Sequence, residues 1–464
     1  MPFVAALSAA IALTLVAYWP TAGAGFQSDD FRWLWHAHFD GWADIGRVFT
    51  ETLGFYRPFT QMLWMFDLRR AGPDPAAFFL TNLVLHLVVL GLFAGIARRL
   101  LEPRSAATAV LLAALSHHYN NMAVIWISGR GALLGTAAAL AALWLWDRWC
   151  CEEGGCGAYL GACAAMAVAL GSYEAVFGVP LLMAMMIRYR GGARSMIAAL
   201  GPIALWAPYL WMRVAVGARQ PWSEGEGYSY DAAAMLPNLL EYIGRAAMID
   251  FILLGIVGIA AAAAGALVAC ARAASSRARP VVVFGGLWFL VGLLPALPVG
   301  SRSSLYVYFA ALGIHLIGGA LIVGAADGLR RHSSRAATAT AGVVVLLVLT
   351  AWPLFAWDRN HRPADQARLS MRAVAEIRAA VPAPGSDECV VLIDTRARRP
   401  NLHQAFSADL FWLSAFTYGE APSYRIRYAE DSAVEPCGTA HRLRLAPDDQ
   451  PGRALLQHDD AMGR

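Results

Sequence analysis

Apolar stretches of roughly 17 to 25 residues recur along most of this chain and limit its fold more than any other feature. Each is long enough to cross a hydrocarbon layer about 30 Å thick as a helix, which satisfies its own backbone hydrogen bonds in lipid. Of the 464 residues, 58% are hydrophobic and only 15% are charged, with a mean hydropathy of +0.48. Soluble globular proteins do not have this composition, so we expect a protein that crosses the bilayer repeatedly.

The pattern predicts an all-α bundle of about eleven transmembrane helices. The predicted spans are 3–22, 77–97, 105–122, 129–149, 157–172, 174–188, 195–213, 246–270, 280–298, 304–325 and 336–356. The first apolar run has no basic segment before it, so we interpret it as a retained span and not as a cleaved signal peptide.

Arginines are concentrated in alternate short connections, which predicts the orientation. They are Arg98, Arg99 and Arg104; Arg188, Arg190 and Arg194; Arg272, Arg277 and Arg279; and Arg330, Arg331 and Arg335. By the positive-inside rule these connections and the N-terminus are cytoplasmic, and the loops 23–76 and 214–245, the turn 299–303 and the tail face outward.

The same distribution of arginines explains the net charge of +4 without a nucleic-acid partner. All 37 basic side chains are arginine, as expected from a GC-rich bacterial genome, so we expect a bacterial inner-membrane protein.

The composition changes after Trp357, where Arg, Asp, Glu and Pro become frequent. We therefore divide the chain into a transmembrane part, 1–356, and a small extracytoplasmic α/β domain, 357–464. The predicted tail elements are helices over 363–381 and 403–416 and strands over 389–394, 424–428 and 441–445, followed by ten disordered residues. Cys389 and Cys437 could form a disulfide in an exported tail. Four of the other five cysteines, Cys150, Cys151, Cys156 and Cys163, lie at or near one short connection and have no histidine at metal-site spacing.

Two adjacent carboxylates, Asp29 and Asp30, follow the first span directly. Transfer of a sugar from a polyprenyl phosphate needs a carboxylate to deprotonate the acceptor hydroxyl, and often a divalent cation or an arginine to hold the phosphate. The pair suits either role. A solvated loop start or caps for a helix beginning at Phe31 would also explain it.

Further polar residues occur where spans meet the outer surface or cross the bilayer. Asn82 and His86 lie four residues apart, on one helix face, where they line a cavity or form a helix–helix hydrogen bond. His117 and His118 could bind a metal or pyrophosphate. Arg130 and Arg302 could hold a phosphate or could simply extend to the interface.

These pieces occur in the order found in one family. The chain resembles the GT-C class of polytopic glycosyltransferases, most closely the branch of the protein O-mannosyltransferases and the tetratricopeptide-associated mannosyltransferases. The matching residues are Asp29 and Asp30; Tyr56-Arg57-Pro58; Asn82 and His86; His117 through Val124 with Gly129-Arg130; and Arg302 with Tyr306 and Tyr308. Glu174 and Arg213 also stand where the family tends to have a Lys-Glu and an Arg. His118 and Asn121 depart from the family, which has Pro and Glu there.

The resemblance implies an inverting transfer from a polyprenyl-phosphate sugar, with Asp29 or Asp30 as the general base. It implies donor or phosphate contacts for Arg57, Asn82, His86, His117, Arg130, Arg302 and Tyr306. A divalent cation, if present, would be held by Asp29, Asp30 or His117. The loop 214–245, which holds Glu224, Glu226, Tyr228 and Tyr230, would cover donor or acceptor.

Two other functions are weighed against this one. A transporter or lipid flippase usually shows related halves or Gly/Pro-broken spans in matching positions, and we find neither. A catalytically silent relative that acts as a scaffold stays open because of the departures at His118 and Asn121. The acceptor, whether protein, glycan or lipid, does not follow from these motifs.

Overall fold

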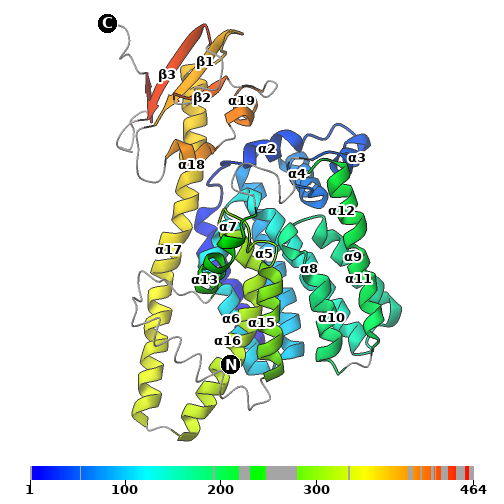
Figure 1. The fold of residues 1–464 in the computed structure, drawn as a ribbon. Helices are drawn as coiled ribbons and strands as arrows, with labels where there is room; N and C mark the ends of the chain where they lie inside the picture. The colour runs from blue at the N-terminus through cyan, green and yellow to red at the C-terminus, as the bar shows by residue number, and fades with distance from the viewer. Residues whose placement is uncertain are drawn as a thin grey trace.

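The fold is that of a helical bundle with a small sheet at one end, shown by a computed structural model (Figure 1). The structure describes residues 3–52, 54–191, 194–218, 230–246, 279–332, 335–394, 401–407, 410–419, 423, 425–429, 437–445 and 455–458. Of residues 117–119, 325 and 328–355 it describes at most the backbone. The predicted span 246–270 therefore lies almost wholly outside the described residues.

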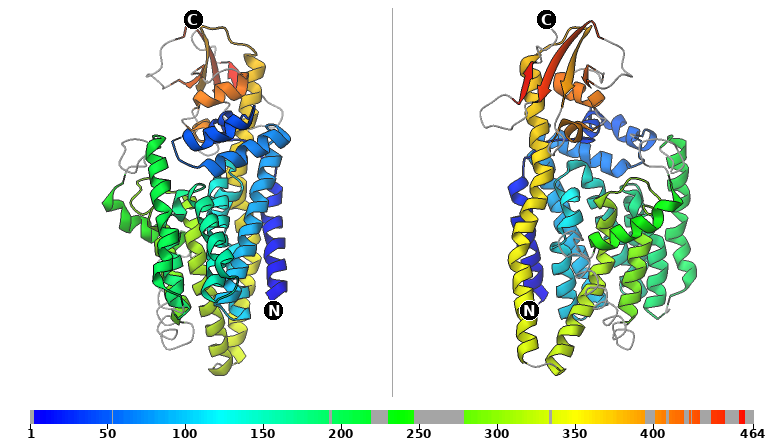
Figure 2. Two further views of the ribbon diagram at one scale, coloured as in Figure 1. Left: turned by 90° about the vertical axis from the view of Figure 1, so that its right-hand side faces the viewer. Right: turned by 60° about the vertical axis from the view of Figure 1, so that its left-hand side comes forward.

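The bundle is built from long apolar helices packed side by side (Figures 1 and 2). They are α1 (Phe3–Tyr18), α5 (Pro75–Leu100), α6 (Pro103–Ala114), α8 (Arg130–Cys150), α9 (Gly155–Leu170), α10 (Val179–Tyr189), α11 (Leu200–Ala204), α12 (Trp206–Ala215), α15 (Arg279–Leu293) and α16 (Val307–His332). Small residues allow close packing: a Cβ added at Gly285 of α15 would lie 2.6 Å from the carbonyl oxygen of Gly313 on α16.

Five described segments are long and apolar enough to cross a membrane: Phe3–Thr21, Pro75–Leu100, Ile127–Cys150, Met196–Ala215 and Ser304–Gly324. Shorter apolar helices lie at Gly155–Leu170 and Arg279–Leu293. The chain is thus a multi-pass membrane protein, and the count of about eleven spans stays a prediction. One predicted span is wrong: 105–122 is not continuous, because α6 ends at Ala114 and α7 (His117–Val124) begins after the non-helical Ser116.

Short helices of the predicted outer loop 23–76 lie across one end of the bundle: α2 (Asp30–His36), α3 (Trp42–Thr50) and α4 (Pro58–Ala71) (Figure 1). Four 3-10 turns matter for the site: η2 (Ile127–Gly129), η3 (Glu174–Val176), η5 (Ala232–Ala234) and η6 (Ser304–Tyr306). Helix α13 (Met235–Ala246) also lies at this end.

A single helix, α17 (Arg335–Ala380), runs through the predicted domain boundary at 357 and carries the chain to the terminal sheet (Figure 2). The sheet has the order β2-β1-β3-β4, with β1 (Glu388–Ile393) parallel to β2 (Ile426–Tyr428) and β3 (Thr439–Leu445). Strand β4 (Leu456–His458) pairs antiparallel with β3. The predicted disorder of the last ten residues is therefore wrong at Leu456–His458, whose backbone completes the edge of the sheet.

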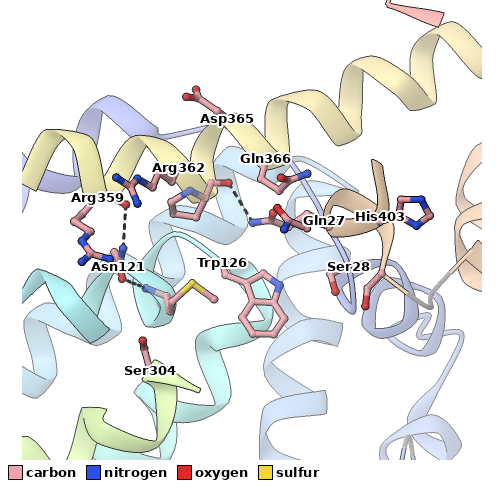
Figure 3. A pocket seen from close by; sticks show the side chains of 14 residues that line it. Gln27, Ser28, Asn121, Trp126, Ser304, Arg359, Arg362, Asp365, Gln366 and His403 are labelled. Carbon is pink, nitrogen blue, oxygen red and sulfur yellow. Dashed lines mark hydrogen bonds between the residues drawn. The ribbon is translucent and has the colours of Figure 1, made fainter. Parts of the chain in front are cut away.

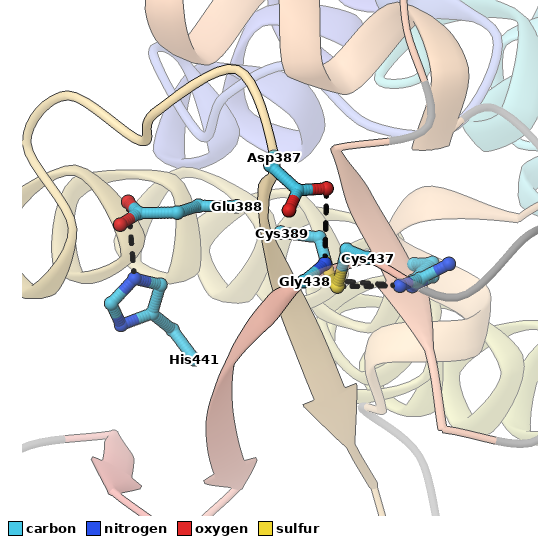
Figure 4. The surroundings of a disulfide bond; sticks show 7 residues. Asp387, Glu388, Cys389, Cys437, Gly438 and His441 are labelled. Carbon is cyan, nitrogen blue, oxygen red and sulfur yellow. Dashed lines mark hydrogen bonds and ion pairs between the residues drawn. A yellow bond between two sulfur atoms is a disulfide. The ribbon is translucent and has the colours of Figure 1, made fainter.

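The predicted helix 403–416 is divided into α18 (Leu402–Phe406) and α19 (Leu410–Tyr418). The division falls at Ser407, whose φ of 50° cannot continue a right-handed helix. The pairing of Cys389 with Cys437, which the sequence left open, is present as a disulfide that joins the start of β1 to the chain just before β3 (Figure 4).

A second hydrophobic core joins the outer loop to the tail. Buried Phe26 and Phe31 pack against Phe416 of α19, with ring centroids 6.0 and 5.1 Å apart, and Phe31 also meets Phe406. The same core includes Leu369 of α17 and strand residues such as Val390. The boundary at 357 between a transmembrane part and a tail domain stays a prediction. Residues from both sides of this boundary belong to the second core.

The disulfide predicts a measurable stability difference. Replacing both cysteines, in Cys389→Ser/Cys437→Ser, removes a cross-link between residues 48 positions apart and should lower the stability of the tail by about 2–4 kcal/mol. Melting temperatures of the purified protein, with and without reductant, check this. Cys156→Ser, which changes an exposed free thiol, is the matched control and should leave the melting temperature unchanged.

Candidate functional site

The two aspartates of the acidic pair differ in burial. Asp30, the first residue of α2, is fully buried, and its carboxylate accepts hydrogen bonds from the backbone N–H of Gln27 (2.8 Å), the backbone N–H of Ser128 (2.8 Å) and the Ser128 hydroxyl. Burial raises the pKa of this carboxyl from 3.8 to about 7, against the opposing effect of the hydrogen bonds. Asp30 thus ties the outer loop to η2, below the first turn of α8.

Asp29, the N-cap of α2, is half-buried and faces a cavity. We call this space of about 240 Å³ the arginine cavity. Its lining comprises Asp29, Arg32, Trp33, Phe55, Arg57, Trp126, Ser128, Tyr173, Ser301, Arg302, Ser303, Leu305 and Tyr306. Four residues singled out from the sequence, Asp29, Arg57, Arg302 and Tyr306, therefore meet around one space, although they are up to 277 positions apart (306 − 29).

Arg57, just before α4, is held in place by Glu174 of η3. The Arg57 Nε and Nη2 atoms lie 2.8 and 2.7 Å from Oε2 of Glu174, and the guanidinium lies over the rings of Phe55 and Tyr173, at 4.3 and 5.1 Å. Arg213 of α12 donates to the other oxygen of Glu174 at 3.3 Å. One carboxylate therefore fixes two guanidinium groups at this edge of the site.

Arg302, in the turn before η6, is held by α13. It donates from Nε to Oδ1 of Asn238 (2.7 Å) and from Nη1 to Oε2 of Glu241 (2.6 Å). Glu241 also pairs with Arg245, which donates to the Ser304 hydroxyl at 2.7 Å. Glu241 and Arg245 were not predicted from the sequence, although their spacing of four residues is typical of an ion pair on a helix.

Two other predicted residues, Asn82 and His86, are buried in the bundle and do not line the cavity. Asn82 donates to the carbonyl groups at the end of α7, including those of Val124 and Trp126 at 3.3 Å. His86 hydrogen-bonds through Nδ1 to the hydroxyl of Tyr308 at 2.6 Å. The helix–helix interpretation of this pair is the one that the contacts favour.

Arg130 is also fully buried. It pairs with Asp67 of α4 at 3.0 Å, donates to the Phe78 carbonyl at 3.0 Å and stacks over Trp64 at 4.5 Å. Its donors are used inside the protein, so we do not retain it as a phosphate ligand. The side chains of His117 and His118 lie outside the described part of the chain.

The described residues do not fit a metal site. They contain no group of three or more His, Cys, Asp and Glu side chains close enough to hold an ion. The carboxylate of Asp30 is occupied by three donors, so the acidic pair does not present two joint ligands. The divalent cation stays a prediction, and no step below depends on it.

Two solved structures share this architecture. ArnT from Cupriavidus metallidurans, bound to undecaprenyl phosphate, matches with a TM-score of 0.54 and 12% sequence identity, over 94% of this chain and 92% of that one. The oligosaccharyltransferase of Archaeoglobus fulgidus in its apo form matches with a TM-score of 0.50 and 11% identity, over 92% of this chain and 64% of that one. By sequence, the chain matches no family model and no curated protein.

The protein therefore has the fold of the GT-C class of membrane glycosyltransferases, as its motifs led us to expect. The identity is low enough that the match establishes the fold alone, and the chemistry has to be argued from the site.

The burial of Asp30 predicts an unusual pH dependence of stability. Since the folded state keeps the proton between about pH 4 and 7 while the unfolded state releases it, stability should fall as the pH rises through this window, by up to a few kcal/mol. Melting temperatures over pH 4.5 to 8 measure the slope. Asp30→Asn should flatten it and lower the stability throughout, because its amide would face the N–H of Gln27.

Asp365→Asn, a change of an exposed carboxylate, is the control and should keep the wild-type slope. An unchanged slope in Asp30→Asn would contradict the assignment of this group.

Proposed function

We propose that the protein is a glycosyltransferase that moves a sugar from a polyprenyl-phosphate donor to an acceptor hydroxyl at the extracytoplasmic face. One observation carries the proposal: a carboxylate, Asp29, and two anchored arginines, Arg57 and Arg302, line one cavity at the end of an apolar bundle. The fold of the bundle is shared with ArnT bound to undecaprenyl phosphate, which supports a lipid-phosphate donor.

Asp29 is the general base in this proposal. It takes the proton of the acceptor hydroxyl while the acceptor oxygen bonds to the anomeric carbon of the sugar, with inversion. The bond from that carbon to the phosphate oxygen breaks, and its electron pair leaves with the polyprenyl phosphate. Asp30 is a positioning residue, because all its oxygens are used to hold the loop.

Arg57 and Arg302 compensate the charge that develops on the leaving phosphate. Their carboxylate partners, Glu174 and Glu241, hold them in place, so little reorganisation is needed during the reaction. Tyr306 and Arg32 complete the polar wall of the cavity. The apolar helices below would accommodate the isoprenoid chain.

The charges of the bundle support the orientation that we propose. At the end of the bundle far from α2, buried Asp147 forms ion pairs with Arg99 and Arg190. The distance between Asp147 and Arg190 is 2.6 Å. Arg99 also pairs with Glu153. We place this arginine-rich end in the cytoplasm of a bacterial cell and the arginine cavity outside.

Replacement of the base tests the reaction. Asp29→Asn should lower turnover by about 10²–10⁴-fold while leaving the melting temperature unchanged, because the amide cannot accept the proton. The assay is release of polyprenyl phosphate from a panel of polyprenyl-phosphate sugars by reconstituted protein, with cell-envelope extract as acceptor and with or without a chelator. Asp40→Asn, a change of an exposed loop carboxylate, is the control; full activity of Asp29→Asn would reject the proposal, as would an inactive wild-type protein.

Cysteine labelling tests the orientation. Cys151, in the connection between α8 and α9, and Cys156, in the first turn of α9, are exposed at the arginine-rich end. A membrane-impermeant maleimide should modify them only after spheroplasts are permeabilised. Labelling in intact spheroplasts would place the arginine cavity in the cytoplasm, out of reach of an extracytoplasmic donor.

A further inference from the structure

A second, larger space lies beside the arginine cavity. This tail cavity, of about 620 Å³, lies between the outer loop, α7, η6, α17 and α18 (Figure 3). Its lining comprises Gln27, Ser28, Asn121, Met122, Trp126, Ser304, Arg359, Arg362, Pro363, Asp365, Gln366, His403, Gln404 and Ser407. Nothing in the reaction proposed above uses it.

The two cavities are separated by a partition one residue thick. Ser28 lines the tail cavity while the next residue, Asp29, lines the arginine cavity. Likewise, Ser304 lines the tail cavity while Ser303 lines the arginine cavity. Trp126 lines both spaces. A molecule held in the tail cavity therefore lies directly beside the proposed base.

The polar groups of the lining favour a hydroxylated molecule. Four side-chain amides, those of Gln27, Asn121, Gln366 and Gln404, and three serine hydroxyls are gathered there. Hydroxyl groups both donate and accept hydrogen bonds, and so do amides and serines. Several of the amides are already oriented: Gln27 donates to the Pro363 carbonyl at 3.3 Å, and Gln366 donates to the Asn401 carbonyl at 2.7 Å.

The lining also favours negative charge and a ring. Arg359 and Arg362 lie on α17 at the cavity, whereas Asp365 pairs with Arg368 at 2.7 Å and points away from Trp126 (Figure 3). The aromatic face of Trp126 offers a stacking surface for a sugar ring. Among the described residues, its indole N–H has no hydrogen-bond acceptor, and a ligand oxygen would satisfy it.

We infer that the tail cavity is the acceptor site and that the acceptor is an acidic saccharide, such as a chain containing uronic acid. This inference rests on the proposed function and specifies its acceptor. The arginines recognise the carboxylates and the amides recognise the hydroxyls. One hydroxyl extends past Trp126, which lines both cavities, to reach Asp29.

Binding to the full chain in lipid nanodiscs tests the inference. The probes are three fluorescently labelled molecules of equal length: trigalacturonate, neutral maltotriose and the acidic peptide triglutamate. Fluorescence polarisation should show trigalacturonate binding at least tenfold more tightly than either of the others. Equal binding of the three, no binding of trigalacturonate, or tighter binding of the peptide would overturn the inference.

Two charge reversals on α17 supply the matched variants. Arg362→Glu should weaken trigalacturonate binding by tenfold or more; its present partner is Asp358, at 2.6 Å in an exposed pair, so the change should not affect folding. Arg372→Glu reverses a charge on the same helix, where Arg372 pairs with Glu376 and neither residue lines the cavity, and it should leave binding unchanged. An equal loss in both variants would show only a general charge effect and would overturn the inference.

The same probe separates this inference from the proposed function. Asp29→Asn should bind trigalacturonate as the wild-type protein does, because binding precedes proton transfer. If trigalacturonate fails to bind while Asp29→Asn is inactive, the acceptor site is wrong and the function stands. If trigalacturonate binds as expected while Asp29→Asn keeps full transfer, the site stands and the proposed reaction fails.

Discussion

The position of Asp29 depends on how tightly the outer loop is held from both sides. A Cβ at Gly25, where φ is 136°, would lie 2.8 Å from the carbonyl oxygen of Ala367 on α17, so only glycine allows this approach. On the tail side, the N–H of Ser28 donates to the Ala405 carbonyl at 2.7 Å, and Phe31 is buried against Phe416. On the bundle side, Asp30 binds Ser128. The tail therefore helps to fix the position of Asp29.

Two neighbouring carboxylates acquire different roles through their surroundings. The side chain of Asp30 is removed from water and surrounded by donors, which makes it a fixed link between loop and bundle. Asp29 stays half-buried at the cavity, where an acceptor can reach it. A base has to exchange protons with its substrate, and only the second environment permits this.

The sequence predicted the membrane bundle, most tail elements and four residues of the cavity, because these depend on apolar length, alternation and ordered motifs. It could not separate site residues from buried frame residues. Asn82, His86 and Arg130 are polar groups at membrane depth, and the cost of burying them is offset equally well by a ligand or by an internal partner. Arg130 has such a partner in Asp67, 63 positions away (130 − 67), which no local pattern reveals. The change of composition at Trp357 falls inside the continuous helix α17. A helix satisfies its own backbone hydrogen bonds in lipid and in water, so a change of composition does not mark its end.

Arg57 and Arg302 each pair with a carboxylate of the protein and still leave positive charge at the cavity. Glu174 divides its charge between Arg57 and Arg213, and Glu241 divides its charge between Arg302 and Arg245. Each set keeps a net positive charge of one, and one guanidinium of each set, that of Arg57 or Arg302, lines the arginine cavity. A leaving phosphate gains negative charge as its bond to the sugar breaks, so donors fixed beforehand stabilise that late charge more than the intact donor. In the proposed reaction, the carboxylates would therefore make the arginines selective for the departing group, and not merely for an anion.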